Sequence, residues 1–94
     1  MATYFMFGTY SDESLSEISA QRTTRAVDLV KKFDGKVEAM YALLGEEDLI
    51  FIVDFPDTAQ AMKASVALTK SLGIAFSTTP AVTAQEFDRM MAEL

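Results

Sequence analysis

The chain has 94 residues, of which 50% are hydrophobic, and a formal net charge of −6. The hydrophobic content excludes a disordered chain, and the excess of acids argues against binding to the phosphate backbone of nucleic acid, which needs clustered Lys and Arg. This length predicts a single domain, residues 1–94, with a small core and a large surface, so we expect a homo-oligomer.

Four residue types are missing altogether: His, Cys, Trp and Asn. Their absence excludes a Ser-His-Asp relay, a thiolate nucleophile, disulfides, and the usual ligands of zinc or haem. We therefore expect no cofactor and no metal. The chain also lacks the pattern of a signal peptide and any apolar run of the ~20 residues that span a membrane, so we expect a cytoplasmic protein without membrane contact.

The first half predicts one strand and one long helix. Residues 3–10 carry apolar side chains on both faces and predict a buried strand. A helix is predicted over residues 12–33, with a capping box at residues 14–17 and a stop at Gly35, which can take the left-handed conformation. The apolar stripe of this helix comprises Leu15, Ile18, Ala26, Leu29, Val30 and Phe33.

The second half predicts three strands and two helices. Residues 37–44 and 49–55 read as a hairpin joined by a short turn, residues 45–48. Asp57 is the expected N-cap of a helix that runs to Leu72 and stops at Gly73. The last strand, residues 74–82, contains Pro80 and therefore belongs at a sheet edge, and Thr83 caps a short final helix.

The order β-α-β-β-α-β predicts an α+β, ferredoxin-like domain: a four-stranded antiparallel sheet with two helices on one face, plus a short C-terminal helix. The other sheet face carries large apolar groups that a monomer would not leave exposed. A second subunit is the simplest cover. Two such sheets face to face would enclose either a filled core or a pocket for a small molecule.

Arg22 falls within the apolar stripe of the first helix, where a charge needs a partner. One hypothesis is that its guanidinium points into a pocket and holds a carboxylate or phosphate. The alternative is that it pairs with an internal carboxylate such as Asp48 or Asp54, or extends along the sheet to water. Buried charges are usually paired within the protein, which favours the alternative.

The acids Glu46, Glu47 and Asp48 occupy the predicted hairpin turn. Three adjacent acids on a turn point in different directions and do not match a calcium loop, so they predict a solvated turn in which Asp48 accepts hydrogen bonds from local backbone amides.

Three strand tyrosines, Tyr4, Tyr10 and Tyr41, are candidates, with Thr78, to place hydroxyls at the space between two sheets. There a tyrosine could orient a ligand or donate a proton. The alternative is that their rings are buried and their hydroxyls bond main-chain carbonyls.

Nearly the whole chain resembles the GYD domain family of the dimeric α/β-barrel superfamily. The resemblance rests on Arg22, on Gly35-Lys36, on residues 41–48 and 52–57, and on the segments Thr78-Thr79-Pro80-Ala81 and Thr83-Ala84-Gln85-Glu86-Phe87. Gly45 and Asp48 match the family's signature, whereas Glu47 stands where the family usually has Tyr. The resemblance implies a dimeric α/β-barrel assembly but carries no activity.

Two function classes remain. The first is an oligomeric binding or assembly module that takes a small, possibly anionic ligand, with Arg22, Tyr41, Asp48 and Tyr4 as the candidate ligand-binding residues. The second is a cofactor-independent enzyme acting on a small aromatic or polyketide-like substrate, by analogy with other proteins of the same fold.

Overall fold

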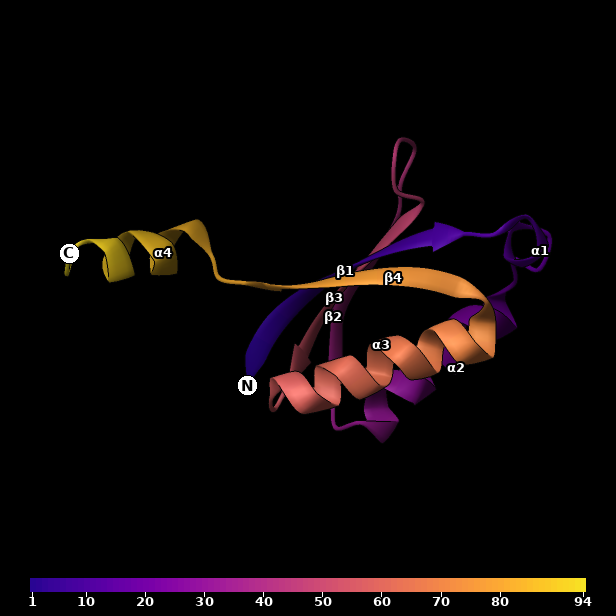
Figure 1. Ribbon diagram of the computed structural model, residues 1–94, viewed down its shortest axis with the longest axis horizontal. Coiled ribbons are helices and arrows are strands. Elements are labelled where there is room, and N and C mark those ends of the chain that lie inside the picture. The colour runs from indigo at the N-terminus through magenta and orange to yellow at the C-terminus, as the bar shows by residue number, and fades with distance from the viewer.

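The computed structural model describes residues 1–94 and contains one four-stranded sheet with helices on one of its faces (Figure 1). The elements follow in the order β1 (Ala2–Tyr10), α1 (Asp12–Leu15), α2 (Ala20–Lys32), β2 (Lys36–Ala42), β3 (Leu49–Phe55), α3 (Thr58–Leu72), β4 (Ile74–Ala81) and α4 (Ala84–Met91). The strand order is β2-β3-β1-β4, and every neighbouring pair is antiparallel. This is the predicted ferredoxin-like arrangement.

The core lies between the sheet and the helices α2 and α3. Side chains alternate along each strand, so every second residue of β3 faces the helices and is buried: Leu49, Phe51, Val53 and Phe55. The helices cover them with Ala26 and Val30 from α2 and with Ala61, Ala64 and Leu68 from α3. The small alanine side chains allow the helices to lie close to the sheet.

The opposite sheet face has no helix over it. The strand register places Phe5 opposite Ile52 and Phe7 opposite Ile50, and Tyr41 of β2 is also opposite Ile50. These side chains are only partly buried, and Tyr41 keeps 59% of its surface exposed. We call this set, together with Ala39, the open sheet face. Monomeric proteins rarely expose a large contiguous apolar surface.

The predicted helix over residues 12–33 is wrong in one respect, because serines divide it into α1 and α2. The Ser11 hydroxyl accepts from the backbone N–H of Ser14 at 3.0 Å, and the Ser11 N–H donates to the Ser14 hydroxyl at 2.7 Å. Ser19 caps α2 by accepting from the backbone N–H of Arg22 at 3.1 Å. Serine favours such caps over helix interiors because its hydroxyl competes for backbone hydrogen bonds.

The predicted capping box at residues 14–17 is therefore displaced to residues 11–14. The break also corrects the predicted apolar stripe, because Leu15 and Ile18 are 55% and 60% exposed instead of packed on the sheet.

Gly35 has a different role from the one predicted. The left-handed residue after α2 is Asp34, with φ of 62°, and Gly35 is not in that conformation. Instead, a Cβ on Gly35 would lie 2.6 Å from Phe55 Cε1 and 2.7 Å from Val30 Cγ1. Glycine is needed here because the chain passes directly against the core.

The hairpin connection is longer than predicted. β2 ends at Ala42, so residues 43–48 form the link to β3 and project from the sheet (Figure 1). The backbone N–H of Asp48 donates to the Gly8 carbonyl at 2.9 Å, which holds the base of this link against β1.

The second half largely matches the prediction. β3 has the expected bounds, and Asp57 caps α3 by accepting from the Gln60 N–H at 2.8 Å. Gly73 ends α3 in the left-handed conformation, with φ of 69°. Pro80 lies on β4, an edge strand as expected, although β4 ends at Ala81 instead of residue 82.

The last helix, α4, stands clear of the rest of the molecule (Figure 1). Thr83 caps it as predicted, accepting from the Glu86 N–H at 3.0 Å, but none of its residues is buried. The radius of gyration is 14.1 Å, whereas a compact chain of this length has about 12 Å. The projecting arm accounts for the difference.

Replacing Gly35 by alanine is expected to destabilise the fold by about 1–3 kcal/mol, since the new methyl group would clash with two buried side chains. Gly45→Ala is the matched control, because a Cβ there meets no atom within 4 Å. Urea unfolding curves of both variants measure the difference. Equal midpoints would contradict the close packing at Gly35.

Candidate functional site

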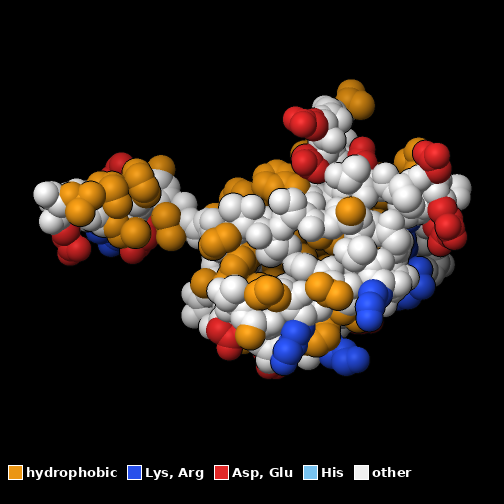
Figure 2. Space-filling view, viewed as in Figure 1, with side chains coloured by type: hydrophobic (Ala, Val, Ile, Leu, Met, Phe, Trp, Pro, Cys, Tyr) orange, Lys and Arg blue, Asp and Glu red, His pale blue; other side chains and the backbone are white.

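The best candidate site is a groove between α3 and β4, with a volume of about 300 Å³. Its walls are apolar, formed by Ala61, Met62 and Val66 of α3 and by Phe76 and Pro80 of β4. Figure 2 shows apolar side chains gathered around this hollow on the face toward the viewer. The remaining four lining residues are Tyr4, Thr58, Ser65 and Thr78, each of which carries a hydroxyl.

These hydroxyls form two pairs. The Tyr4 hydroxyl lies 3.0 Å from that of Thr58, and the Ser65 hydroxyl is hydrogen-bonded to that of Thr78. A hydroxyl has one donor and two acceptor positions, so each pair keeps capacity for a further hydrogen bond. No lining residue is charged. Chemically, the groove suits an uncharged molecule that is mostly apolar and has a carbonyl, amide or hydroxyl group.

Tyr4 is held firmly in this site. Its ring is 4% exposed and meets the Phe55 ring edge-on, with centroids 5.8 Å apart. Its register partner is Val53, on the helix-covered side of the sheet. The hydroxyls of Tyr4 and Thr78 therefore face the groove under α3 and not the open sheet face, where we had expected them.

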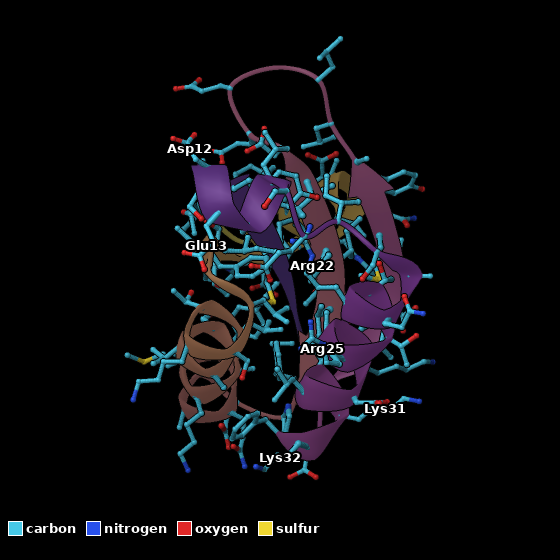
Figure 3. The ribbon with its side chains drawn as sticks, turned by 90° about the vertical axis from the view of Figure 1, so that its right-hand side faces the viewer. Asp12, Glu13, Arg22, Arg25, Lys31 and Lys32 are labelled. Atoms are coloured by element: carbon cyan, nitrogen blue, oxygen red, sulfur yellow. The ribbon has the colours of Figure 1, made fainter.

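Arg22 belongs to the first turn of α2, and its side chain extends toward α1 (Figure 3). It is 5% exposed. Its Nη1 donates to the Ser14 carbonyl of α1, and its guanidinium carbon lies 5.0 Å from the centre of the Tyr10 ring. The structure contains two salt bridges, Lys36 with Glu38 and Arg89 with Glu86, so the predicted ion pair of Arg22 with Asp48 or Asp54 is wrong.

The two carboxylates proposed as partners have other donors. Asp48 Oδ2 accepts from the backbone N–H of Tyr10 at 2.8 Å, and Asp54 Oδ1 accepts from the Thr3 hydroxyl at 2.6 Å. The Asp48 bond reaches β1 instead of the local turn amides that we had expected. Glu47 likewise accepts from the Thr9 hydroxyl, at 2.8 Å. Together with the bond from the Asp48 N–H to the Gly8 carbonyl, three hydrogen bonds join the acidic turn to β1.

The hollow beside Arg22 measures about 70 Å³. This space is much smaller than the groove between α3 and β4, at about 300 Å³. A role of Arg22 in anion binding stays a prediction.

The four predicted ligand-binding residues do not converge. Tyr4 lines the groove, Arg22 lies under α1, Tyr41 lies on the open sheet face, and Asp48 is joined to Arg22 only indirectly, through Tyr10. Thr58 and Ser65 are not among the residues predicted from the sequence to bind a ligand. Thr58 follows the predicted N-cap Asp57, and Ser65 lies seven residues later, on the same side of the predicted helix. This spacing of two hydroxyl residues was the feature of the sequence that could have indicated them.

Nowhere do three acidic side chains gather closely enough to hold a metal ion. None of the helices has both the length and the apolar character needed to span a membrane.

Comparison with known proteins gives one family match and several similar folds. The model of the GYD domain matches residues 4–91. No curated protein matches the chain.

Among solved structures, the leucine response regulatory protein (LrpA) of Mycobacterium tuberculosis is similar, with a TM-score of 0.58 at 13% identity over 88% of this chain and 51% of that one. A glycine-to-threonine mutant of Rv3291c gives a TM-score of 0.59 at 12% identity, over 89% of this chain and 52% of that one. The chain thus spans about half the length of these proteins, and the likeness shows the fold alone.

Arg22→Leu is expected to destabilise the protein by about 1–3 kcal/mol, because α1 loses the hydrogen bond from the Arg22 guanidinium and the Ser14 carbonyl keeps only its bond from the Glu17 N–H, at 3.2 Å. The exposed Arg25 on α2 supplies the control, since Arg25→Leu should change stability by no more than about 0.5 kcal/mol. Chemical denaturation of both variants makes the comparison. An Arg22 variant as stable as the Arg25 variant would show that Arg22 does not hold α1 in place.

Proposed function

The chain belongs to the GYD domain family, and on that premise we propose that it is a homo-oligomeric module that binds a small, uncharged molecule in the groove between α3 and β4. The observation that carries the proposal is the lining of the groove: apolar walls around four hydroxyls, with no charged side chain. Ligand sites commonly combine apolar walls with a few polar groups that fix orientation.

The oligomer is supported by the open sheet face. Phe5, Phe7, Ile50 and Ile52 form adjacent cross-strand pairs with no helix over them, and Tyr41 extends the patch toward the sheet edge. A second copy placed sheet to sheet would bury these side chains, at a separation of about 10 Å between the two sheets. Each additional 100 Å² of apolar surface buried in this way contributes about 2.5 kcal/mol before the cost of association.

Binding is favoured over catalysis by the composition of the groove. Carboxylates, lysines and arginines are missing from its lining, so proton transfer would depend on the Tyr4 hydroxyl alone. The cofactor-independent enzyme stays a prediction. Ligand-binding roles for Arg22, Tyr41 and Asp48 also stay predictions, since all three lie outside the groove.

The proposal is tested with two probes of the same shape, benzamide and benzoate, which are uncharged and anionic respectively. We expect benzamide to raise the melting temperature of the wild-type protein more than benzoate does, because no cation lines the groove. Tyr4→Phe should weaken benzamide binding about fivefold, the equivalent of one lost hydrogen bond of ~1 kcal/mol. Titration followed by NMR measures the dissociation constants.

Tyr41→Phe is the matched control. It also removes a tyrosine hydroxyl, but from the open sheet face, and should leave benzamide binding unchanged. Equal effects of the two substitutions would contradict the groove as the site. If benzoate but not benzamide stabilises the wild-type protein, and Arg22→Leu abolishes that stabilisation, the ligand is bound at Arg22 instead.

A further inference from the structure

We propose that the C-terminal arm, residues 82–94, docks on a second copy of this chain, where α4 lies along α3 and covers the groove between α3 and β4. The inference concerns the site proposed above and rests on that groove, but it does not depend on what ligand the groove holds. Each chain has one arm and one groove, so a two-fold pair of chains can exchange arms reciprocally.

The first argument is the apolar face of α4. Phe87, Met90 and Met91 of α4, with Leu94 three residues beyond its end, follow the i, i+3, i+4, i+7 spacing of one helix face, and all four are exposed. Figure 2 shows apolar side chains gathered on the face of the arm toward the viewer. An isolated helix of eight residues is unstable in water, so α4 requires a surface on which to pack.

The second argument is that α3 offers a matching surface. Met62 and Val66 are 63% and 58% exposed, although they line the groove on its α3 side. The same two residues also line the shallow hollow on the outer side of α3, beside Lys63 and Lys70. They therefore form an apolar ridge at the rim of the groove. A helix resting on this ridge would close the groove and leave the hydroxyls of Tyr4 and Thr78 beneath it.

The third argument is charge. Helix α3 carries Lys63 and Lys70 and contains no acid, whereas the arm has three acids, Glu86, Asp88 and Glu93, against one base. That base, Arg89, is paired with Glu86 at 2.8 Å. With the apolar face of α4 on the ridge, the acids of the arm can approach the two lysines. Complementary charges of this kind orient a docking surface and select the partner.

The path of the chain favours a second copy over the chain's own groove. β4 runs straight into the arm, and α4 lies beyond the end of the sheet, away from α3 of the same chain (Figure 1). Only Val82 and Thr83 link β4 to α4. To reach its own groove, α4 would have to reverse direction across these two residues, whereas an arm that continues outward reaches a neighbouring molecule.

The chain has no cysteine, so single cysteines can report the contact without background. Two full-length chains are co-expressed, one with Met62→Cys and the other with Met90→Cys and a tag that changes its mass. Mild oxidation should then yield a covalent pair of tagged and untagged chains, identified by mass spectrometry. A docked pair has an effective concentration on the order of millimolar, so it should cross-link about 1,000-fold faster than chains that meet by chance at micromolar concentration.

In the control, Thr24→Cys on the exposed side of α2 replaces Met62→Cys. It should cross-link to Met90→Cys only at the rate of chains that meet by diffusion. A second pair, Val66→Cys with Met91→Cys, guards against a single variant that fails to fold. If the cross-linked heterodimer forms no faster than in the control for both cysteine pairs, the proposal is overturned.

Two further outcomes would also overturn it. The double variant Met62→Cys/Met90→Cys would cross-link within one chain if the arm folds back on its own groove. Ile52→Cys would capture Met90→Cys in place of Met62→Cys if the arm covers the open sheet face. Because cross-linking needs no ligand, a docked arm without benzamide binding would refute only the proposed function, and benzamide binding without cross-linking would refute only the arm exchange.

Discussion

The structure depends on one constraint: the sheet is apolar on both faces, but the helices cover only one. On the covered side, alternate residues of β3 pack against the alanines of α2 and α3, and they account for much of the core. Only 16 of the 94 residues are buried. Such a small core is marginal for a chain of this length unless association removes more apolar surface from water. The open sheet face, the groove and α4 are the three apolar surfaces left for that purpose.

The fold could be read from the sequence wherever one strong local signal decided each element. β3 is apolar on both faces, and α3 lies between a capping aspartate and a left-handed glycine, so both were predicted with correct bounds. Residues 12–33 were not, because serines at positions 11, 14, 16 and 19 offer several competing caps. Which serine becomes the N-cap depends on where α1 must lie over the end of the sheet. That is a tertiary effect.

The candidate site was less predictable than the fold. The burial of Arg22 followed from its helical position, but its partner did not. The sequence suggested a carboxylate, whereas the structure supplies the Ser14 carbonyl and the Tyr10 ring. That carbonyl became available only because the helix breaks after α1. The groove hydroxyls come from β1, β4 and α3, and strand register alone brings Tyr4 and Thr78 beneath the same helix. No local sequence pattern predicts that these two side chains lie close together.

The three uncovered apolar surfaces lead to one central claim, that the folded unit is a pair of chains or a multiple of that pair. Native mass spectrometry of the unmodified protein at micromolar concentration tests this claim most directly. The chain has a mass of 10.3 kDa, and the account predicts species at even multiples of this value. A single folded species at the mass of one chain would contradict it, because one chain cannot cover the open sheet face, the groove and α4 by itself.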